Sequence, residues 1–172
     1  MNKDSKISLK MIDAIVMDFD GVLTNNKVIV NEEGTESVVC SRSDGIAFDA
    51  MRKLGIKSFV ISSERNRVVA KRSQKLSTNV IHGSNDKCKS IIEITKQNQI
   101  ELSRTLFVGN DINDYHAMEM AGYRACPNDS HPFIKEIANI VTWKNGGDGV
   151  IREILEEHLG LDLLKLLYKQ EA

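Results

Sequence analysis

Two carboxylates, Asp18 and Asp20, stand directly after a short apolar run in the stretch I-V-M-D-F-D-G-V-L-T. The run, residues 15–17, predicts a buried strand, and in a parallel sheet its end lies at the edge where α/β proteins bind ligands. Two adjacent carboxylates are stabilised in their ionised form by a divalent cation. One can attack phosphorus, while the other can protonate a leaving alkoxide and then activate water. The alternative is an acidic turn without chemistry, built on Asp20 and Gly21.

Alternating strands and helices are expected to hold these acids in place. This alternation predicts an α/β fold, a Rossmann-like parallel sheet with helices on both faces. Strands are expected at residues 15–17, 56–61, 79–82, 105–108, 123–126 and 140–143. Helices are expected at residues 43–54, 65–75, 86–97, 115–122, 133–138 and 150–159. The glycine-rich loop 144–149 is interpreted as a hinge or a subunit contact.

Residues 25–43 form the one β-rich segment outside this alternation. Two runs, V-I-V and S-V-V-C, flank a polar loop that ends in Gly34, which predicts a hairpin. Because exposed hairpin edges favour pairing, we expect a neighbouring copy of the chain to associate here and to cover the candidate site that contains Asp18 and Asp20. The alternative is a hairpin that only decorates a monomer.

The motif D-F-D-G-V-L-T resembles the haloacid dehalogenase superfamily of phosphohydrolases. The resemblance implies that Asp18 is the nucleophile, and that Asp20 is the general acid and base and lends its carbonyl oxygen to Mg²⁺. Ser62, at the end of the second core strand, matches the residue that binds a phosphoryl oxygen. Lys87, after the third, matches the lysine that offsets the negative charge.

The segment G-N-D-I-N-D, after the fourth strand, matches the motif that completes the magnesium shell in this superfamily. The residue after the glycine is normally an aspartate, and here it is Asn110, whose amide oxygen can bind Mg²⁺ but carries no charge. Asp111 or Asp114 is a candidate to compensate through water. The expected metal-binding residues are Asp18, Asp20, Asn110, Asp111 and Asp114.

Nearly the whole chain, including S-D-G-I and G-G-D-G-V-I-R-E, resembles the capless sugar-acid phosphate phosphatases. In this group a small hairpin replaces a cap domain, and members are typically tetramers whose tails reach a neighbour's site. The resemblance implies one domain over residues 1–172, with the hairpin at about 25–43, a tail from about 160, and a homotetramer.

Two positions separate the substrates within this group. Enzymes that act on 3-deoxy-octulosonate 8-phosphate resemble T-G-R after the second strand, whereas those for nine-carbon acids carry G-E and then a lysine one helix later. Because this chain has Ser63-Glu64 and Lys75, we predict a nonulosonate (KDN or N-acylneuraminate) 9-phosphate, with octulosonate 8-phosphate as the alternative. Glu64 would accept hydrogen bonds from sugar hydroxyls, and Lys75 or Arg72 would pair with the sugar carboxylate. The predicted substrate contacts are Ser43, Asp44, Ser63, Glu64, Arg72 and Lys75.

A non-catalytic reading also follows from the resemblance. The domains fused to some CMP-sialate synthetases look like degenerate phosphatases that hold a tetramer, and Asn110 resembles that group. A tetramerisation or regulatory module has no need of Asp18, Asp20 and Lys87 together, which favours an enzyme. A receiver-like domain phosphorylated on Asp18 is a third reading, which the D-x-D-G pair disfavours.

Composition excludes several other classes. The chain has 172 residues, 41% of them hydrophobic, and its net charge of −1 gives no footprint for nucleic acid or an anionic membrane. The sequence contains no apolar run of membrane-spanning length and no signal-peptide core at its amino terminus. The three cysteines are widely separated, which favours reduced thiols and a cytoplasmic location.

Overall fold

The computed structural model describes residues 7–169, and its centre is a six-stranded parallel sheet in the order β5-β4-β1-β6-β7-β8. The predicted α/β fold is confirmed, although the last strand is shorter than expected. The strands of this sheet are β1 (Ala14–Met17), β4 (Lys57–Ser62), β5 (Asn79–His82), β6 (Thr105–Val108), β7 (Tyr123–Cys126) and β8 (Ile140–Val141).

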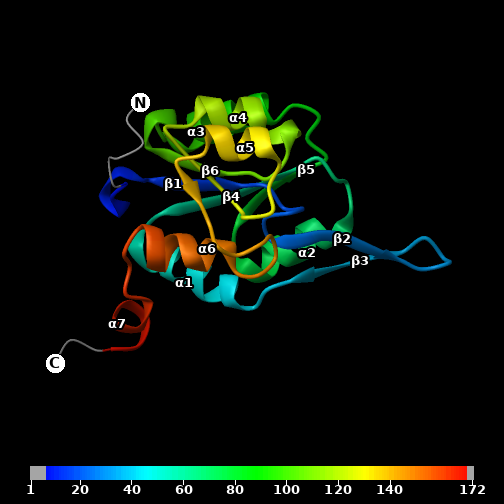
Figure 1. The fold of residues 1–172 in the computed structure, drawn as a ribbon, viewed down its shortest axis with the longest axis horizontal. Coiled ribbons are helices and arrows are strands. Elements are labelled where there is room, and N and C mark those ends of the chain that lie inside the picture. The colour runs from blue at the N-terminus through cyan, green and yellow to red at the C-terminus, as the bar shows by residue number, and fades with distance from the viewer. Residues whose placement is uncertain (1–6, 170–172) are drawn as a thin grey trace.

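Helices cover both faces of the sheet (Figure 1). One layer holds α1 (Ser43–Leu54), α2 (Arg67–Leu76) and α6 (Val150–Glu153), and the other holds α3 (Lys87–Asn98), α4 (Tyr115–Met120) and α5 (Pro132–Ile137). Helix α6 continues as a π-helical turn, Ile154–His158, so the predicted helix 150–159 is not one regular α-helix. Short 3₁₀ turns lie at Leu9–Met11, Leu102–Arg104 and Ile112–Asp114.

Strand β1 contributes to the cores on both faces. Ile15 and Met17 pack against α1 and α6, whereas Ala14 and Val16 pack against α3 and α4. All four side chains are fully buried. A strand covered on both faces carries continuous apolar residues, which explains why the run before Asp18 does not alternate.

The path of the chain creates a switch point beside β1. From β1 the chain passes through the hairpin to β4 and β5 on one side, and then returns to β6 on the other side. The carboxyl ends of β4, β1 and β6 therefore meet at one edge of the sheet, which is the place where open α/β sheets bind ligands.

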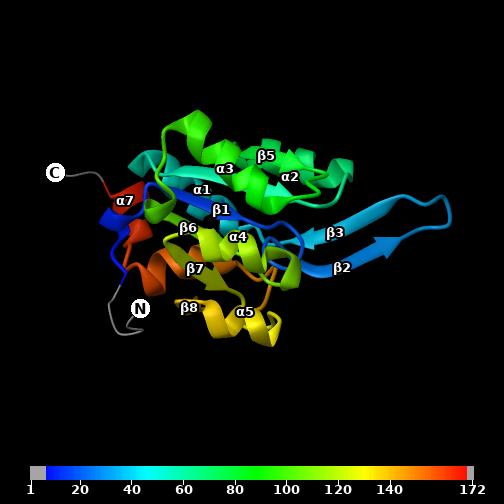
Figure 2. The same cartoon turned by 90° about the horizontal axis from the view of Figure 1, so that it is seen from above.

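The hairpin consists of β2 (Thr24–Val30) and β3 (Glu36–Cys40), and it extends away from the body (Figure 2). Its pairing is antiparallel, with an irregularity between Thr24 and Val28. Four branched side chains are each more than half exposed on it: Val28, Ile29, Val30 and Val39. Such an apolar surface on a projecting edge is a candidate contact site.

The carboxyl-terminal helix α7 (Leu163–Tyr168) lies at the end of the body opposite to the hairpin tip (Figures 1 and 2). Leu163 is buried in the core, and Lys53 of α1 donates to the carbonyl oxygen of Leu166. The tail therefore docks on its own chain up to this helix. Residues 1–6 and 170–172 of the predicted domain lie outside the described residues. Across residues 7–169, every helix is too short or too polar to cross a bilayer.

Candidate active site

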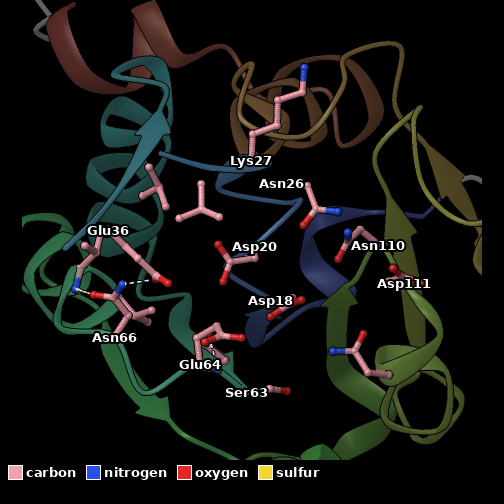
Figure 3. A pocket seen from close by; sticks show the side chains of 16 residues that line it. Asp18, Asp20, Asn26, Lys27, Glu36, Ser63, Glu64, Asn66, Asn110 and Asp111 are labelled. Carbon is pink, nitrogen blue, oxygen red and sulfur yellow. Dashed lines mark hydrogen bonds between the residues drawn. The ribbon is translucent and has the colours of Figure 1, made fainter. Parts of the chain in front are cut away.

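An open pocket of about 330 Å³ lies at the carboxyl ends of β1, β4 and β6 (Figure 3). The hairpin and the first turn of α2 form its outer wall. Its polar lining consists of Asp18, Asp20, Asn26, Lys27, Glu36, Ser62, Ser63, Glu64, Asn66, Asn110, Asp111 and Asn113. The structure thus brings together residues that are far apart in the sequence.

Asp18 follows the last residue of β1, and its own backbone extends the sheet. Its N–H donates to the carbonyl oxygen of Val108 over 2.9 Å, and its Oδ1 accepts from the N–H of Phe19 over 2.7 Å. Lys87 Nζ lies 2.9 Å from the same Oδ1. The carboxylate is only 5% exposed, so it is held in one orientation at the floor of the pocket.

Lys87 lies between two buried carboxylates. Its Nζ is 2.9 Å from Asp18 Oδ1 and 2.6 Å from Asp114 Oδ1. Burial raises the pKa of Asp18 to about 7, repulsion from Asp114 adds to this rise, and Lys87 opposes it. Burial opposes the charge on Lys87, but the two carboxylates outweigh this and raise its pKa. A lysine in a first helical turn is unfavourable for the helix dipole, so the two acids account for its position.

Asp114 closes the loop after β6 instead of lining the pocket. Lys87 occupies its Oδ1, and the backbone N–H of Asn110 donates to its Oδ2 over 2.9 Å. Both carboxylate oxygens of Asp114 therefore have protein partners, and its predicted contribution to the metal site through water stays a prediction. Asp111 does line the pocket, where its Oδ1 accepts from the N–H of Ile112.

Asp20 lies above Asp18 at the centre of the pocket and is half-buried (Figure 3). Burial raises its pKa, and a hydrogen bond from the Thr24 hydroxyl opposes the rise. A carboxyl with a raised pKa retains its proton closer to neutral pH, which suits a general acid.

The arrangement of oxygens around Asn110 fits a divalent cation. Its amide oxygen faces only oxygens, 2.9 Å from the carbonyl oxygen of Asp20 and 3.3 Å from Asp18 Oδ2. With the amide turned, its NH₂ donates to both oxygens; in the orientation described, the three oxygens are the groups that would hold a cation. Mg²⁺ holds oxygens at about 2.1 Å in an octahedron, so neighbouring ligand oxygens are about 3 Å apart. Gly21 is required here, because a Cβ on it would collide with the Asn110 side chain.

The oxygens that could bind a metal at this site come from a carboxylate, a backbone carbonyl and a side-chain amide. In the described part of the chain, residues 7–169, no group of three His, Cys, Asp or Glu side chains is placed to hold a metal. A cation would therefore depend on the Asp18 carboxylate, the Asp20 carbonyl and the Asn110 amide. All three are hard oxygen ligands of the kind that Mg²⁺ prefers.

Ser62 ends β4 inside the pocket and is 1% exposed. Its Oγ accepts from the N–H of Glu64 over 3.1 Å, and because this bond uses a lone pair, the hydroxyl can still donate to a bound phosphoryl oxygen. Ser63 and Glu64 are exposed at the rim. Ser62, Ser63 and Glu64 therefore line the same pocket as Asp18.

Ser43 and Asp44, two of the predicted substrate contacts, lie outside the pocket lining. Asp44 is buried, and its Oδ1 accepts from the N–H of Ile151 over 3.1 Å at the start of α6. Burial raises the pKa of Asp44 to about 6, and hydrogen bonds from α6 oppose the rise. The Ser43 hydroxyl pairs with that of Ser41 over 2.6 Å. Both side chains therefore fasten α1 to its neighbours.

Arg72 and Lys75, on α2, also lie outside the pocket lining. Arg72 Nη2 donates to the carbonyl oxygen of Ser41 over 2.7 Å, which secures the end of the hairpin. Lys75 is exposed. Their predicted contact with a sugar carboxylate stays a prediction.

Sequence reasoning missed the residues that form the outer wall. Asn66 caps α2 by accepting from the N–H of Val68, and its Nδ2 donates to Glu36 Oε2 over 2.6 Å (Figure 3). Asn26 has a left-handed backbone with φ of 59°, and Lys27 follows it. The position of Asn66 before an apolar run indicates a helix cap. No neighbouring residue in the sequence indicates that the Asn66 side chain also faces the hairpin.

The fold and the site define a class of α/β hydrolases that work with a carboxylate pair beside a buried lysine. The chain belongs to the haloacid dehalogenase-like hydrolase family, whose model matches residues 46–154. The matched segment contains Ser62, Lys87 and Asn110, and Asp18 precedes it.

Several relatives are named as phosphatases of one sugar-acid phosphate. The 3-deoxy-D-manno-octulosonate 8-phosphate phosphatase of Yersinia pestis is 25% identical over 146 residues, which cover 84% of this chain and 78% of the relative. Among solved structures, a HAD family hydrolase from Streptomyces avermitilis is 36% identical, covers 92% of this chain and 91% of its own, and has a TM-score of 0.88.

A further solved structure is the octulosonate 8-phosphate phosphatase of Moraxella catarrhalis, in complex with magnesium ion, phosphate ion and KDO. It is 30% identical, with a TM-score of 0.82, and the alignment covers 91% of this chain and 88% of that one. These relatives confirm the resemblance to the capless sugar-acid phosphatases.

Proposed function

We propose that this protein is a Mg²⁺-dependent phosphatase that hydrolyses a sugar-acid phosphate monoester through an aspartyl-phosphate intermediate. The observation that carries the proposal is the placement of Asp18 at the pocket floor, 2.9 Å from Lys87 and beside Asp20. The relatives named above support the reaction class.

The residues divide the reaction into two steps. Asp18 attacks phosphorus, the bond to the leaving oxygen breaks, and Asp20 gives its proton to that oxygen. Asp20 then takes a proton from water, which attacks the aspartyl phosphate and restores Asp18. Ser62 binds a phosphoryl oxygen, and Lys87 offsets negative charge at Asp18. Asp18, Asp20 and Asn110 would hold Mg²⁺, whose positive charge would offset the negative charge of the phosphoryl group and favour ionised Asp18.

Relatives and pocket favour different sugar acids. The relatives from Yersinia pestis and Moraxella catarrhalis are named as phosphatases of 3-deoxy-octulosonate 8-phosphate, which makes this eight-carbon acid the first candidate. The nine-carbon 9-phosphate is the second candidate, supported by Glu64 at the pocket rim. Lys75, the other residue behind that prediction, lies outside the lining.

Phosphate release from octulosonate 8-phosphate, KDN 9-phosphate and N-acylneuraminate 9-phosphate tests the choice. We expect the highest kcat/KM with the eight-carbon acid. A preference of about tenfold or more for a nine-carbon acid, equal to about 1.4 kcal/mol of transition-state binding, would establish the second candidate. No release from any of them would support the non-catalytic module.

The Asn110→Asp substitution should strengthen the binding of Mg²⁺. It adds a charge where the amide oxygen faces Asp18 and Asp20, so the Mg²⁺ concentration for half-maximal activity should fall by about tenfold. Asn113→Asp is the matched control, because Asn113 lines the same pocket but is exposed. Equal magnesium titrations of both variants and the unaltered protein would argue against a ligand role for Asn110.

We also propose that the protein forms a homotetramer through its hairpins. Ile29 is 64% exposed on the projecting strand β2. Ile29→Lys should therefore lower the mass measured by light scattering. The control is Leu164→Lys, at an equally apolar position that is 59% exposed at the opposite end of the body. A single mass for all three proteins would exclude the hairpin as the contact.

Two further expectations are retained as proposals. We propose that residues 1–172 form one domain, since the described helices pack on the two faces of one six-stranded sheet and the hairpin lies between two of its strands in the chain. We propose a cytoplasmic location, since Cys40, Cys88 and Cys126 are free thiols.

A further inference from the structure

Thr24, the first residue of β2, uses its hydroxyl in three hydrogen bonds. The oxygen accepts from the backbone N–H of Gly21 and of Asn26, each over 3.2 Å, and donates to Asp20 Oδ1 over 3.3 Å. A hydroxyl has one hydrogen and two lone pairs, so all three are in use. Because two of the partners are donors, the hydrogen must point to Asp20.

The surroundings of Thr24 keep this hydroxyl in place. Its side chain is fully buried. The N–H of Gly147 donates to the carbonyl oxygen of Val22 over 3.0 Å. A Cβ on Gly146 would collide with the carbonyl oxygen of Gly21. The glycine-rich loop 144–149 is therefore packed against this turn of its own chain, and its interpretation as a hinge or a subunit contact stays a prediction.

The same hydroxyl links a residue just before the hairpin to a carboxylate at the pocket centre. Asn26, which donates to it, lies in the left-handed region just before the hairpin and faces the pocket (Figure 3). Asp20, which accepts from it, is half-buried at the pocket centre. Within residues 7–169, the Asp18 side chain bonds to Lys87 and to the N–H of Phe19 and makes no bond to Thr24.

We propose that Thr24 is a positioning residue that aims the Asp20 carboxyl at the leaving oxygen of the substrate. This inference rests on the proposed function. In the step concerned, the proton of Asp20 passes to the leaving oxygen as its bond to phosphorus breaks. Without the hydroxyl, the Asp20 side chain loses the bond that fixes its Oδ1, while Asp18 keeps its own contacts.

The dependence on the leaving group distinguishes this role from a general structural one. A sugar alkoxide needs a proton to leave, whereas p-nitrophenoxide leaves without one. The measured quantity is kcat/KM, which covers the steps up to the first phosphoryl transfer. Thr24→Val keeps the size of the side chain and removes the hydroxyl. Thr24→Ser keeps the hydroxyl.

We expect Thr24→Val to lower kcat/KM for octulosonate 8-phosphate by about 10²-fold, which is within the range of general acid catalysis. The kcat/KM for p-nitrophenyl phosphate should stay nearly unchanged. Thr24→Ser should restore the sugar-acid reaction. Thr105→Val is the matched control, because Thr105 is equally buried and its hydroxyl bonds only to a remote carbonyl. It should leave the ratio between the two substrates unaltered.

An equal loss for both substrates in Thr24→Val would overturn the inference. If the valine variant does not fold, Thr24→Ala takes its place. The measured quantity is then the ratio of kcat/KM for the sugar-acid phosphate to kcat/KM for p-nitrophenyl phosphate, which does not depend on the amount of folded protein. Failure of the unaltered protein to release phosphate from any of the tested substrates would instead contradict the proposed function.

Discussion

Asp18→Asn is expected to lower phosphate release from the sugar-acid phosphate by about 10⁴-fold or more, because an amide oxygen does not attack phosphorus as a carboxylate does. The substitution keeps the size of the side chain and an oxygen acceptor near Lys87. Continuous phosphate detection at saturating Mg²⁺ measures the effect.

Asp13→Asn is the matched control for this variant. Asp13 precedes β1 on the same segment, is exposed, and pairs with Arg104 at the opposite edge of the sheet. It should retain full activity. A residual rate in Asp18→Asn above about a tenth of the original would mean that another group attacks, since a loss of 1.4 kcal/mol is too small for a nucleophile.

Lys87→Met is expected to lower the free energy of unfolding by about 3–5 kcal/mol at pH 8, the usual cost of removing one partner from a buried ion pair. Methionine fills a similar volume but leaves Asp18 and Asp114 without their common counter-ion. Urea unfolding without Mg²⁺ measures the loss. Activity should fall as well, because two uncompensated carboxylates favour protonated Asp18.

The pH dependence of this loss has a definite sign. Removal of Lys87 takes away the charge that opposes the rise in the pKa of Asp18, so this pKa rises further in the folded state. A carboxyl whose folded pKa is raised stabilises the protein at low pH and loses that contribution as pH rises. The deficit should therefore narrow as pH falls toward about 7, the value to which burial raises the pKa of Asp18 when Lys87 is present, and stay constant below it, where Asp18 is protonated in both folded proteins.

Lys89→Met, two residues later on α3, is the control. The Lys89 side chain is 86% exposed and pairs only with Asp86, so its removal should change stability by no more than about 0.5 kcal/mol. The double variant Lys87→Met, Asp114→Asn should regain part of the loss. If Lys87→Met is as stable as Lys89→Met, the buried charges do not depend on Lys87.

The sequence was sufficient to predict that the site residues that follow strands lie close together. Asp18 and Ser62 come directly after predicted strands, and Asn110 is separated from one by Gly109 alone. Because parallel strands end at one edge, the proximity of these residues follows from the fold. Lys87 had a weaker local signal, a cation in a first helical turn. Its position 2.9 Å from Asp18 supplies the reason for that placement.

The remaining parts of the site depend on contacts between distant segments. Asp44 has the local pattern of a helix start, yet it caps α6, far along the chain. Asn66 has the pattern of a cap and is one, but its other bond, to Glu36, exists only because the hairpin folds over α2. The role of Thr24 depends likewise on a turn held by a loop at the other end of the sequence.

The most direct test of the central claim is to trap the phosphorylated enzyme in the Asp20→Asn variant with p-nitrophenyl phosphate and Mg²⁺. Attack by Asp18 needs no acid with this leaving group, whereas hydrolysis of the aspartyl phosphate needs Asp20 as a base. We predict a burst of about one p-nitrophenol per active site, and homoserine at position 18 after acid quenching and borohydride reduction. Steady release of p-nitrophenol with no burst and no modification of Asp18 would contradict the mechanism.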